Sequence, residues 1–211
     1  ENAWRQAAPK LGGSAMYIEV GTQVSIENLL QGMIVQSGND ATVALAEHVA
    51  GTEATFVQMM NSFAKRLGLT GTHFTDAAGM PNPDQYITAR DAALLANALI
   101  HEFPEYYKWY SQKEFTWNEI TQQNRNGLLW RDPSVDGVKT GHTKSAGYCL
   151  VTSAKRGDMR LVSAVMGTDS MRAREEASAA LLNYGFNFFE TKRIYAAGQP
   201  LSTMRVWKGK L

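Results

Sequence analysis

The sequence is poor in the residues that form disulfides and metal sites. Cys149 is its only cysteine, so an internal disulfide is excluded. Because Cys149 falls within an apolar strand pattern, we expect a buried and inert thiol. The four histidines show no ligand spacing of the His-Glu-x-x-His kind. We therefore expect no metal ion and no cofactor.

An excess of charge and a long hydrophobic run are also missing. The 21 Lys and Arg residues face 20 Asp and Glu residues without a basic run, which argues against a nucleic-acid partner. No apolar run approaches membrane-spanning length. No signal peptide heads the chain, an absence that a processed, exported protein would share. The 211 residues, 44% of them hydrophobic, predict one globular domain with a sizeable core and an appendage.

Two buried helices with a polar loop between them are predicted near the start. Ser25 is the expected N-cap of the first helix, whose apolar residues recur at spacings of three and four: Ile26, Leu29, Leu30, Met33 and Ile34. Asn39 or Asp40 is the expected cap of the second. Ser37-Gly38-Asn39 then lies in a tight loop at the edge of a core, where rigid support suits a functional site. The plainer alternative is an inter-helix turn with a good cap.

Further helices are marked by their ends. Thr52 starts one helix and Gly68 stops it, whereas Thr88 with Asp91 resembles a capping box for another. Residues 172–190 predict a long helix with one side formed by Ala177, Leu181, Tyr184 and Phe188. Its first turn carries Arg172 and Arg174, which oppose the helix dipole and predict a negative group nearby.

The chain divides near its end. Residues 198–200, Gly-Gln-Pro, indicate a boundary, and residues 203–207 predict a further strand. We therefore expect one domain over residues 1–197, and over residues 198–211 a linker with the start of a C-terminal β domain.

An antiparallel meander is predicted in the second half. Residues 135–143, 146–154 and 159–166 have strand patterns, and a Lys-Arg-Gly-Asp turn separates the last two. The first strand contains Lys139-Thr140-Gly141 and is expected at a sheet edge, where the missing side chain of Gly141 leaves room for a ligand backbone. Taken alone, Lys-Thr-Gly is a common chance match at a strand end.

Together, Ser37-Gly38-Asn39 and Lys139-Thr140-Gly141 resemble the motifs of penicillin-recognising serine enzymes. The likeness extends to residues 34–41 (IVQSGNDA), 124–130 (NRNGLLW), 135–142 (VDGVKTGH) and 184–190 (YGFNFFE). From Ser14 onward the chain resembles the low-molecular-mass D-alanyl-D-alanine carboxypeptidases of the penicillin-binding protein 5 type. The fold implied is α/β (α+β), a penicillin-binding protein/serine β-lactamase-like transpeptidase fold with an antiparallel sheet flanked by helices and a helical subdomain.

The resemblance also implies roles for individual residues. Ser37, Asn39 and Lys139 are the expected catalytic residues. Substrate binding is expected at Gly38, Thr140, Gly141, His142 and Arg174. The backbone N–H of His142 is expected to form half of an oxyanion hole, and Thr140 with Arg174 to bind the substrate carboxylate. Arg125 is expected mainly to serve the turn in which it lies.

The family's nucleophile is the serine of a Ser-x-x-Lys motif upstream of Ser-Gly-Asn. This sequence has one match, Ser62 to Lys65, but helical geometry turns Ser62 by about 120° and Lys65 by about 180° from the apolar face. Its position after Ser-Gly-Asn is also the wrong order. We therefore expect a chain that begins after the nucleophile helix and is inactive alone.

The implied partners are peptidoglycan stem peptides and β-lactam antibiotics. The implied location is the periplasm, at the inner membrane through a C-terminal anchor not present in this sequence. Two alternatives remain open. A class A β-lactamase shares Lys-Thr-Gly but has Ser-Asp-Asn where this chain has Gly38, and a non-catalytic peptidoglycan-binding module would form no penicillin adduct.

Overall fold

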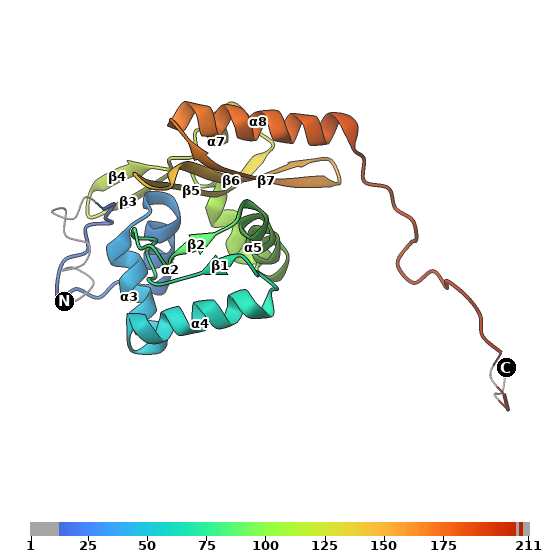
Figure 1. The fold of residues 1–211 in the computed structure, drawn as a ribbon, viewed down its shortest axis with the longest axis horizontal. Helices are drawn as coiled ribbons and strands as arrows, with labels where there is room; N and C mark the ends of the chain where they lie inside the picture. The colour runs from blue at the N-terminus through green and yellow to red at the C-terminus, as the bar shows by residue number, and fades with distance from the viewer. Residues whose placement is uncertain (1–12, 206, 209–211) are drawn as a thin grey trace.

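A three-stranded antiparallel sheet lies between one long helix and a group of shorter helices in the computed structural model, which describes residues 13–205, 207 and 208 (Figure 1). The helices are α2 Ile26–Gln31, α3 Asn39–Ala50, α4 Glu53–Arg66, α5 Ala89–Glu102, α6 Pro104–Tyr107, α7 Leu128–Arg131 and α8 Met171–Phe188, with the π-helix η2 Gly32–Gln36 and the 3₁₀-helix η3 Lys108–Ser111. The strands are β1 Thr72–His73, β2 Tyr86–Ile87, β3 Glu114–Trp117, β4 Ile120–Gln123, β5 Val135–Thr143, β6 Gly147–Arg156 and β7 Met159–Thr168.

The predicted helix starts are confirmed at three of four positions. The hydroxyls of Ser25, Thr52 and Thr88 accept hydrogen bonds from backbone N–H groups three residues on, which satisfies donors that the first helical turn leaves free. At α3 the prediction was wrong by one residue, because Gly38 occupies the cap position. The Asp40 carboxylate instead accepts from the backbone N–H groups of Met16 and Ile18, which ties the N-terminal segment to α3.

The first predicted helix changes geometry before it reaches Ser37. It starts as α2 and continues as η2, whose last residue is the buried Gln36. Ser37 follows with a φ of 59°, the left-handed region that few residues other than glycine adopt. π-Helical turns and such backbone angles are often found at functional sites. The turn between the two helices is therefore a strained one.

The predicted meander is confirmed, with strand order β5-β6-β7. Lys139 pairs with Val151 and Gly141 with Cys149 of β6. Because β5 is the first strand in the order β5-β6-β7, it is an edge strand of this sheet. Side chains alternate between two cores, because successive residues of a strand point to opposite faces. Leu150 packs toward Leu182 of α8, whereas Val151 packs with Val138 near Tyr107.

The predicted apolar side of α8 faces away from the sheet. Leu181, Tyr184 and Phe188 are exposed, whereas Arg174 and Leu182 are buried. Leu182 packs into a core with residues of β5 and β6, and that contact decides which side of the helix turns inward. The expected negative partner is present for Arg172, which pairs with Glu176, whereas Arg174 donates to neutral backbone carbonyls.

Beyond α8, residues 189–205, 207 and 208 form neither helix nor strand and run away from the sheet (Figure 1). The strand predicted for residues 203–207 is absent at residues 203–205, and Val206 lies outside the described residues. The domain division stays a prediction. In the described part of the chain, none of the helices has the length and apolar character needed to span a bilayer.

Candidate active site

Ser37 and Lys139 meet across the boundary between the helices and the sheet. Lys139 Nζ donates a hydrogen bond to Ser37 Oγ at 2.9 Å, although 102 positions separate the two residues. Ser37 is placed by the end of η2 and Lys139 by the edge strand β5. The hydroxyl and the amine of these two predicted catalytic residues therefore lie in direct contact.

The surroundings of Lys139 disfavour its positive charge. Burial, followed by the nearby charges of Arg125 and Arg174, lowers the pKa of Lys139 from 10.5 to about 8. An ammonium with a pKa near neutrality gives up its proton at small cost, as a general acid must. Because Lys139 donates to Ser37, the hydroxyl proton of Ser37 is free to point toward another acceptor.

Gly38 and Asn39 are confined by the N-terminal segment. A Cβ at Gly38 would lie 2.9 Å from Asp40 Oδ1 and 3.0 Å from the backbone nitrogen of Met16, so the position has no room for a side chain. Asn39 Nδ2 donates to the thioether of Met80 at 3.6 Å. A Cβ at Gly13 would press on the same amide nitrogen. The Asn39 carboxamide therefore lies between the Met80 sulfur and the backbone at Gly13.

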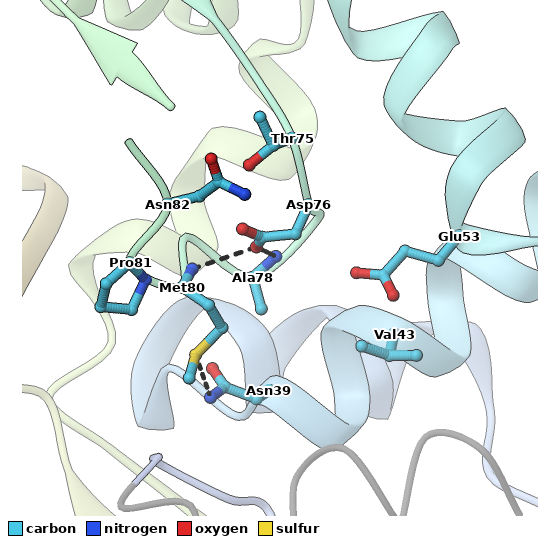
Figure 2. A pocket seen from close by; sticks show the side chains of 9 residues that line it. All are labelled: Asn39, Val43, Glu53, Thr75, Asp76, Ala78, Met80, Pro81 and Asn82. Atoms are coloured by element: carbon cyan, nitrogen blue, oxygen red, sulfur yellow. Dashed lines mark hydrogen bonds between the residues drawn. The ribbon is translucent and has the colours of Figure 1, made fainter. Parts of the chain in front are cut away.

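An open cavity of about 340 Å³ adjoins Asn39. Figure 2 shows the Asn39 amide against the Met80 sulfur at one side, and the Glu53 carboxylate pointing into the space between α4 and the loop that carries Asp76. The cavity is lined by Asn39, Val43, Glu53, Thr75, Asp76, Ala78, Met80, Pro81 and Asn82. Met80 thus lies between the amide of a predicted site residue and an open space.

The Lys-Thr-Gly strand has one free edge in the described part of the chain. β6 pairs with β5 on one side, and no other strand of residues 13–205 pairs with it. Gly141 and His142 are exposed, and Thr140 is half-buried. The His142 imidazole stacks on Tyr148 with ring centroids 4.0 Å apart. The side chain is thus held on β6, which leaves the backbone of His142 as the group available to a ligand.

Arg174 lies beneath this strand. Only 2% of the residue is exposed, and its guanidinium donates to the backbone carbonyls of Gly141, Cys149 and Arg125. Arg125 in turn donates to the Ser14 hydroxyl. Arg174 is therefore close to the predicted site, and its two terminal nitrogens donate to the main chain, whereas its buried Nε has no hydrogen-bond partner among the described residues.

Two residues that support β5 were missed as such by the sequence patterns. Asn126, 1% exposed, donates to the Gly137 carbonyl at 3.2 Å. The Tyr107 hydroxyl donates to Asp136, and a Cβ at Gly137 would lie 2.5 Å from that hydroxyl. The only sequence signals were an Asn-Arg-Asn-Gly turn and a cluster of aromatic residues. Neither signal indicates that Asn126 and Tyr107 pack against β5 at Gly137, two residues before Lys139.

The alternative Ser-x-x-Lys match lies outside the site, as predicted. Ser62 and Lys65 are exposed on α4, and the Ser62 hydroxyl donates to the Gln58 carbonyl one turn earlier. This geometry agrees with the rotation expected from helical periodicity. The motif is a surface feature of α4.

The prediction of a buried thiol was wrong. Cys149 is half-buried, because its strand neighbour is Gly141 and its sulfur accepts from the backbone of Gly167, two positions without side chains to cover it. Across residues 13–205, 207 and 208, no three His, Cys, Asp or Glu side chains are grouped closely enough to hold a metal ion.

The family model and the curated sequences that match this chain point to the same protein family. The family described as D-alanyl-D-alanine carboxypeptidase, peptidase S11, matches residues 1–170. The D-alanyl-D-alanine carboxypeptidases DacD and DacC of Escherichia coli strain K12 are 48% and 50% identical to the chain. Each alignment covers 99% of the chain, and 54% and 53% of the relative. The chain thus spans about half the length of the curated relatives it matches.

Solved structures extend the likeness to the fold. Penicillin-binding protein 5 from Haemophilus influenzae superposes with a TM-score of 0.91 at 48% identity, over 95% of this chain and 58% of the other. The Streptomyces K15 DD-transpeptidase superposes with a TM-score of 0.82 at 30% identity, over 89% of this chain and 78% of the other.

Proposed function

Because this chain belongs to the D-alanyl-D-alanine carboxypeptidase family, peptidase S11, and has the penicillin-binding-protein fold predicted from its motifs, we propose that the complete protein removes the terminal D-alanine from peptidoglycan stem pentapeptides through an acyl-enzyme. The observation that carries the proposal is the 2.9 Å hydrogen bond from Lys139 Nζ to Ser37 Oγ. It joins the two motifs at one point where a proton can be passed.

The nucleophile of the proposed reaction is a serine outside these 211 residues. The one Ser-x-x-Lys match in the sequence is exposed on α4, so the complete protein takes this motif from elsewhere and the 211 residues alone are inactive. The serine oxygen bonds to the carbonyl carbon between the two terminal D-alanines, and the C–N bond then breaks to release D-alanine. Water hydrolyses the resulting ester.

Ser37 and Lys139 supply the proton that the leaving amine needs. Ser37 donates its hydroxyl proton to the leaving nitrogen and takes a proton from Lys139 as it does so. The lowered pKa of Lys139, about 8, reduces the free energy needed to remove its proton near neutral pH. The charge of Lys139 also lowers the pKa of the neighbouring base of the Ser-x-x-Lys motif by like-charge repulsion.

The substrate lies antiparallel along the free edge of β5, where an extended peptide can form main-chain hydrogen bonds. Gly141 leaves room for its backbone, whereas Gly38 lets the loop pack against Met16 and Asp40 beside the site. The N–H of His142 points at the carbonyl oxygen that becomes negative, and the nucleophile's own N–H forms the second half of the oxyanion hole. Asn39 holds the substrate amide.

Thr140 and Arg174 form the proposed carboxylate subsite. The hydroxyl of Thr140 is the direct contact. The guanidinium of Arg174 is buried and bonded to three carbonyls, so its contribution is its charge and its support of the strand. A cation just below a peptide edge favours a substrate whose terminal group is a carboxylate.

β-Lactam antibiotics acylate the same serine in this proposal, because their strained amide occupies the place of the D-Ala-D-Ala bond. The substrate is a cell-wall polymer, so the enzyme acts in the periplasm, at the inner membrane through a C-terminal anchor. The class A β-lactamase alternative is disfavoured at Gly38, where the aspartate of its Ser-Asp-Asn motif would meet the Met16 backbone.

Replacing Lys139 in the complete enzyme tests the proposal. We expect Lys139→Ala to lower the second-order rate of acylation by a fluorescent penicillin by about 10²-fold or more, the scale of one catalytic proton-transfer group. Lys65→Ala is the matched control, because Lys65 belongs to the exposed motif on α4. Near-normal labelling of the Lys139 variant would contradict the proposal, and so would loss of labelling in the Lys65 variant.

A further inference from the structure

Met80 is the residue through which the proposed site meets the cavity of Figure 2. Its sulfur accepts the hydrogen bond of Asn39 Nδ2 at 3.6 Å. In the proposed function Asn39 holds the substrate amide, and Met80 engages one of the two N–H donors of the Asn39 side chain. A ligand that uses this donor must compete with Met80 for it.

The loop that carries Met80 is held tightly although it contains no helix or strand. Asp76 Oδ1 accepts from the backbone N–H groups of Ala78, Gly79 and Met80 at 2.8, 2.6 and 3.1 Å. The Gln85 amide donates to the Met80 carbonyl at 2.9 Å. These bonds fix the Met80 backbone on both sides, so the position of its side chain against Asn39 follows from the loop.

The Met80 side chain borders the open cavity as well as Asn39. The residue is 36% exposed and lines an open cavity. A thioether sulfur has two lone pairs, and the Asn39 amide uses one of them. The second is available to a small oxidant that enters the cavity.

We propose that Met80 is an oxidation site that controls the proposed active site, with hydrogen peroxide as the class of oxidant. The sulfur lone pair forms the S–O bond as the peroxide O–O bond breaks, and water leaves. The sulfur loses two electrons and the peroxide gains them. The product, a sulfoxide, places a strongly accepting oxygen within reach of Asn39 Nδ2, where the thioether was a weak acceptor.

The sulfoxide then holds Asn39 more strongly than the thioether does. A substrate or β-lactam amide that binds the same N–H loses its partner, because that N–H bonds to the sulfoxide oxygen instead. A single competing hydrogen bond changes an affinity or rate by roughly five- to tenfold. This inference rests on the proposed function for its effect on acylation, but the effect on Asn39 itself does not depend on that function.

Two leucine variants separate Met80 from the other methionines. Met80→Leu keeps an apolar side chain of similar size and cannot be oxidised. Met59→Leu is the matched control, because Met59 is 39% exposed, close to the 36% of Met80, and lies on α4 away from Asn39. Each complete enzyme is treated with hydrogen peroxide until mass spectrometry shows one added oxygen at residue 80 in the proteins that retain Met80.

The acylation rate by a fluorescent penicillin is then compared before and after treatment within each protein. We expect a loss of roughly five- to tenfold in the unsubstituted enzyme and in Met59→Leu, and no loss in Met80→Leu. An unsubstituted enzyme that keeps its rate with Met80 fully oxidised would overturn the proposal. An equal loss in Met80→Leu would also overturn it.

A second measurement on the 211-residue chain is independent of catalysis. The side-chain amide resonances of Asn39, followed by ¹⁵N NMR, should shift on peroxide treatment of the unsubstituted chain and of Met59→Leu, but not of Met80→Leu. Unchanged resonances with Met80 oxidised would refute the contact. If the untreated complete enzyme forms no penicillin adduct, the proposed function fails, and the NMR result alone then decides the role of Met80.

Discussion

Lys139 connects the proposed chemistry to folding stability at the scale of one residue. Its pKa is about 8 in the folded protein and 10.5 as the reference value, so below pH 8 both states carry the proton and the folded state bears the cost of a buried charge. Between pH 8 and 10.5 only the unfolded state holds the proton, and stability therefore rises with pH.

A comparison with Lys139→Met isolates this effect. We expect the free energy of unfolding of the unsubstituted chain to rise relative to the variant by up to about 3 kcal/mol between pH 8 and 10.5. Urea unfolding of both proteins across this range measures it. Tyr107 and Tyr110, whose pKa values are raised by burial, oppose the rise above pH 10 in both proteins and cancel in the difference. A difference that stays flat with pH would contradict the lowered pKa.

At the scale of an element, α8 connects its cap to the site. The Ser170 hydroxyl accepts from the Ala173 N–H at 3.1 Å, and Arg174 lies one residue further on. We expect Ser170→Ala to lower the free energy of unfolding by about 1 kcal/mol, because the first turn loses a partner for its N–H group. Thermal or urea unfolding measures the change.

Two further variants make the cap prediction specific. Ser170→Asp should restore stability, since a carboxylate accepts the same hydrogen bond and suits the positive end of the helix dipole. Ser202→Ala, an exposed serine in the segment after α8, should have no measurable effect. Equal losses in Ser170→Ala and Ser202→Ala would show that the cap does not stabilise α8.

At the scale of the whole molecule, the two motifs meet, and the proposed function takes its nucleophile from outside these 211 residues. Ser37 already accepts from Lys139, and the exposed Ser62 bonds to its own helix backbone. We expect the 211-residue chain to form no covalent adduct when incubated with a penicillin, as measured by intact mass. An adduct mapped to Ser62 would reopen the rejected motif, and one mapped to Ser37 would change the proposed role of that hydroxyl.

Local patterns in the sequence determined much of the scaffold. The caps at Ser25, Thr52 and Thr88 follow from short-range hydrogen bonding. The meander follows from alternation and turn residues. The helical rotation of Ser62 and Lys65 away from the apolar face is likewise a local property. The association of Ser37-Gly38-Asn39 with Lys139-Thr140-Gly141 came from resemblance to a family, because no local rule relates positions about a hundred residues apart.

Contacts between distant segments decided the rest. The side of α8 that turns inward depends on the packing of Leu182 against the sheet, and hydrophobic periodicity indicated the opposite side. The pKa of Lys139 depends on burial and on two arginines from other segments. The bond from Asn39 to Met80 joins a helix start to an irregular loop. Burial, charge environment and contact between distant residues are properties of the folded chain. Neither composition nor local residue spacing predicts them.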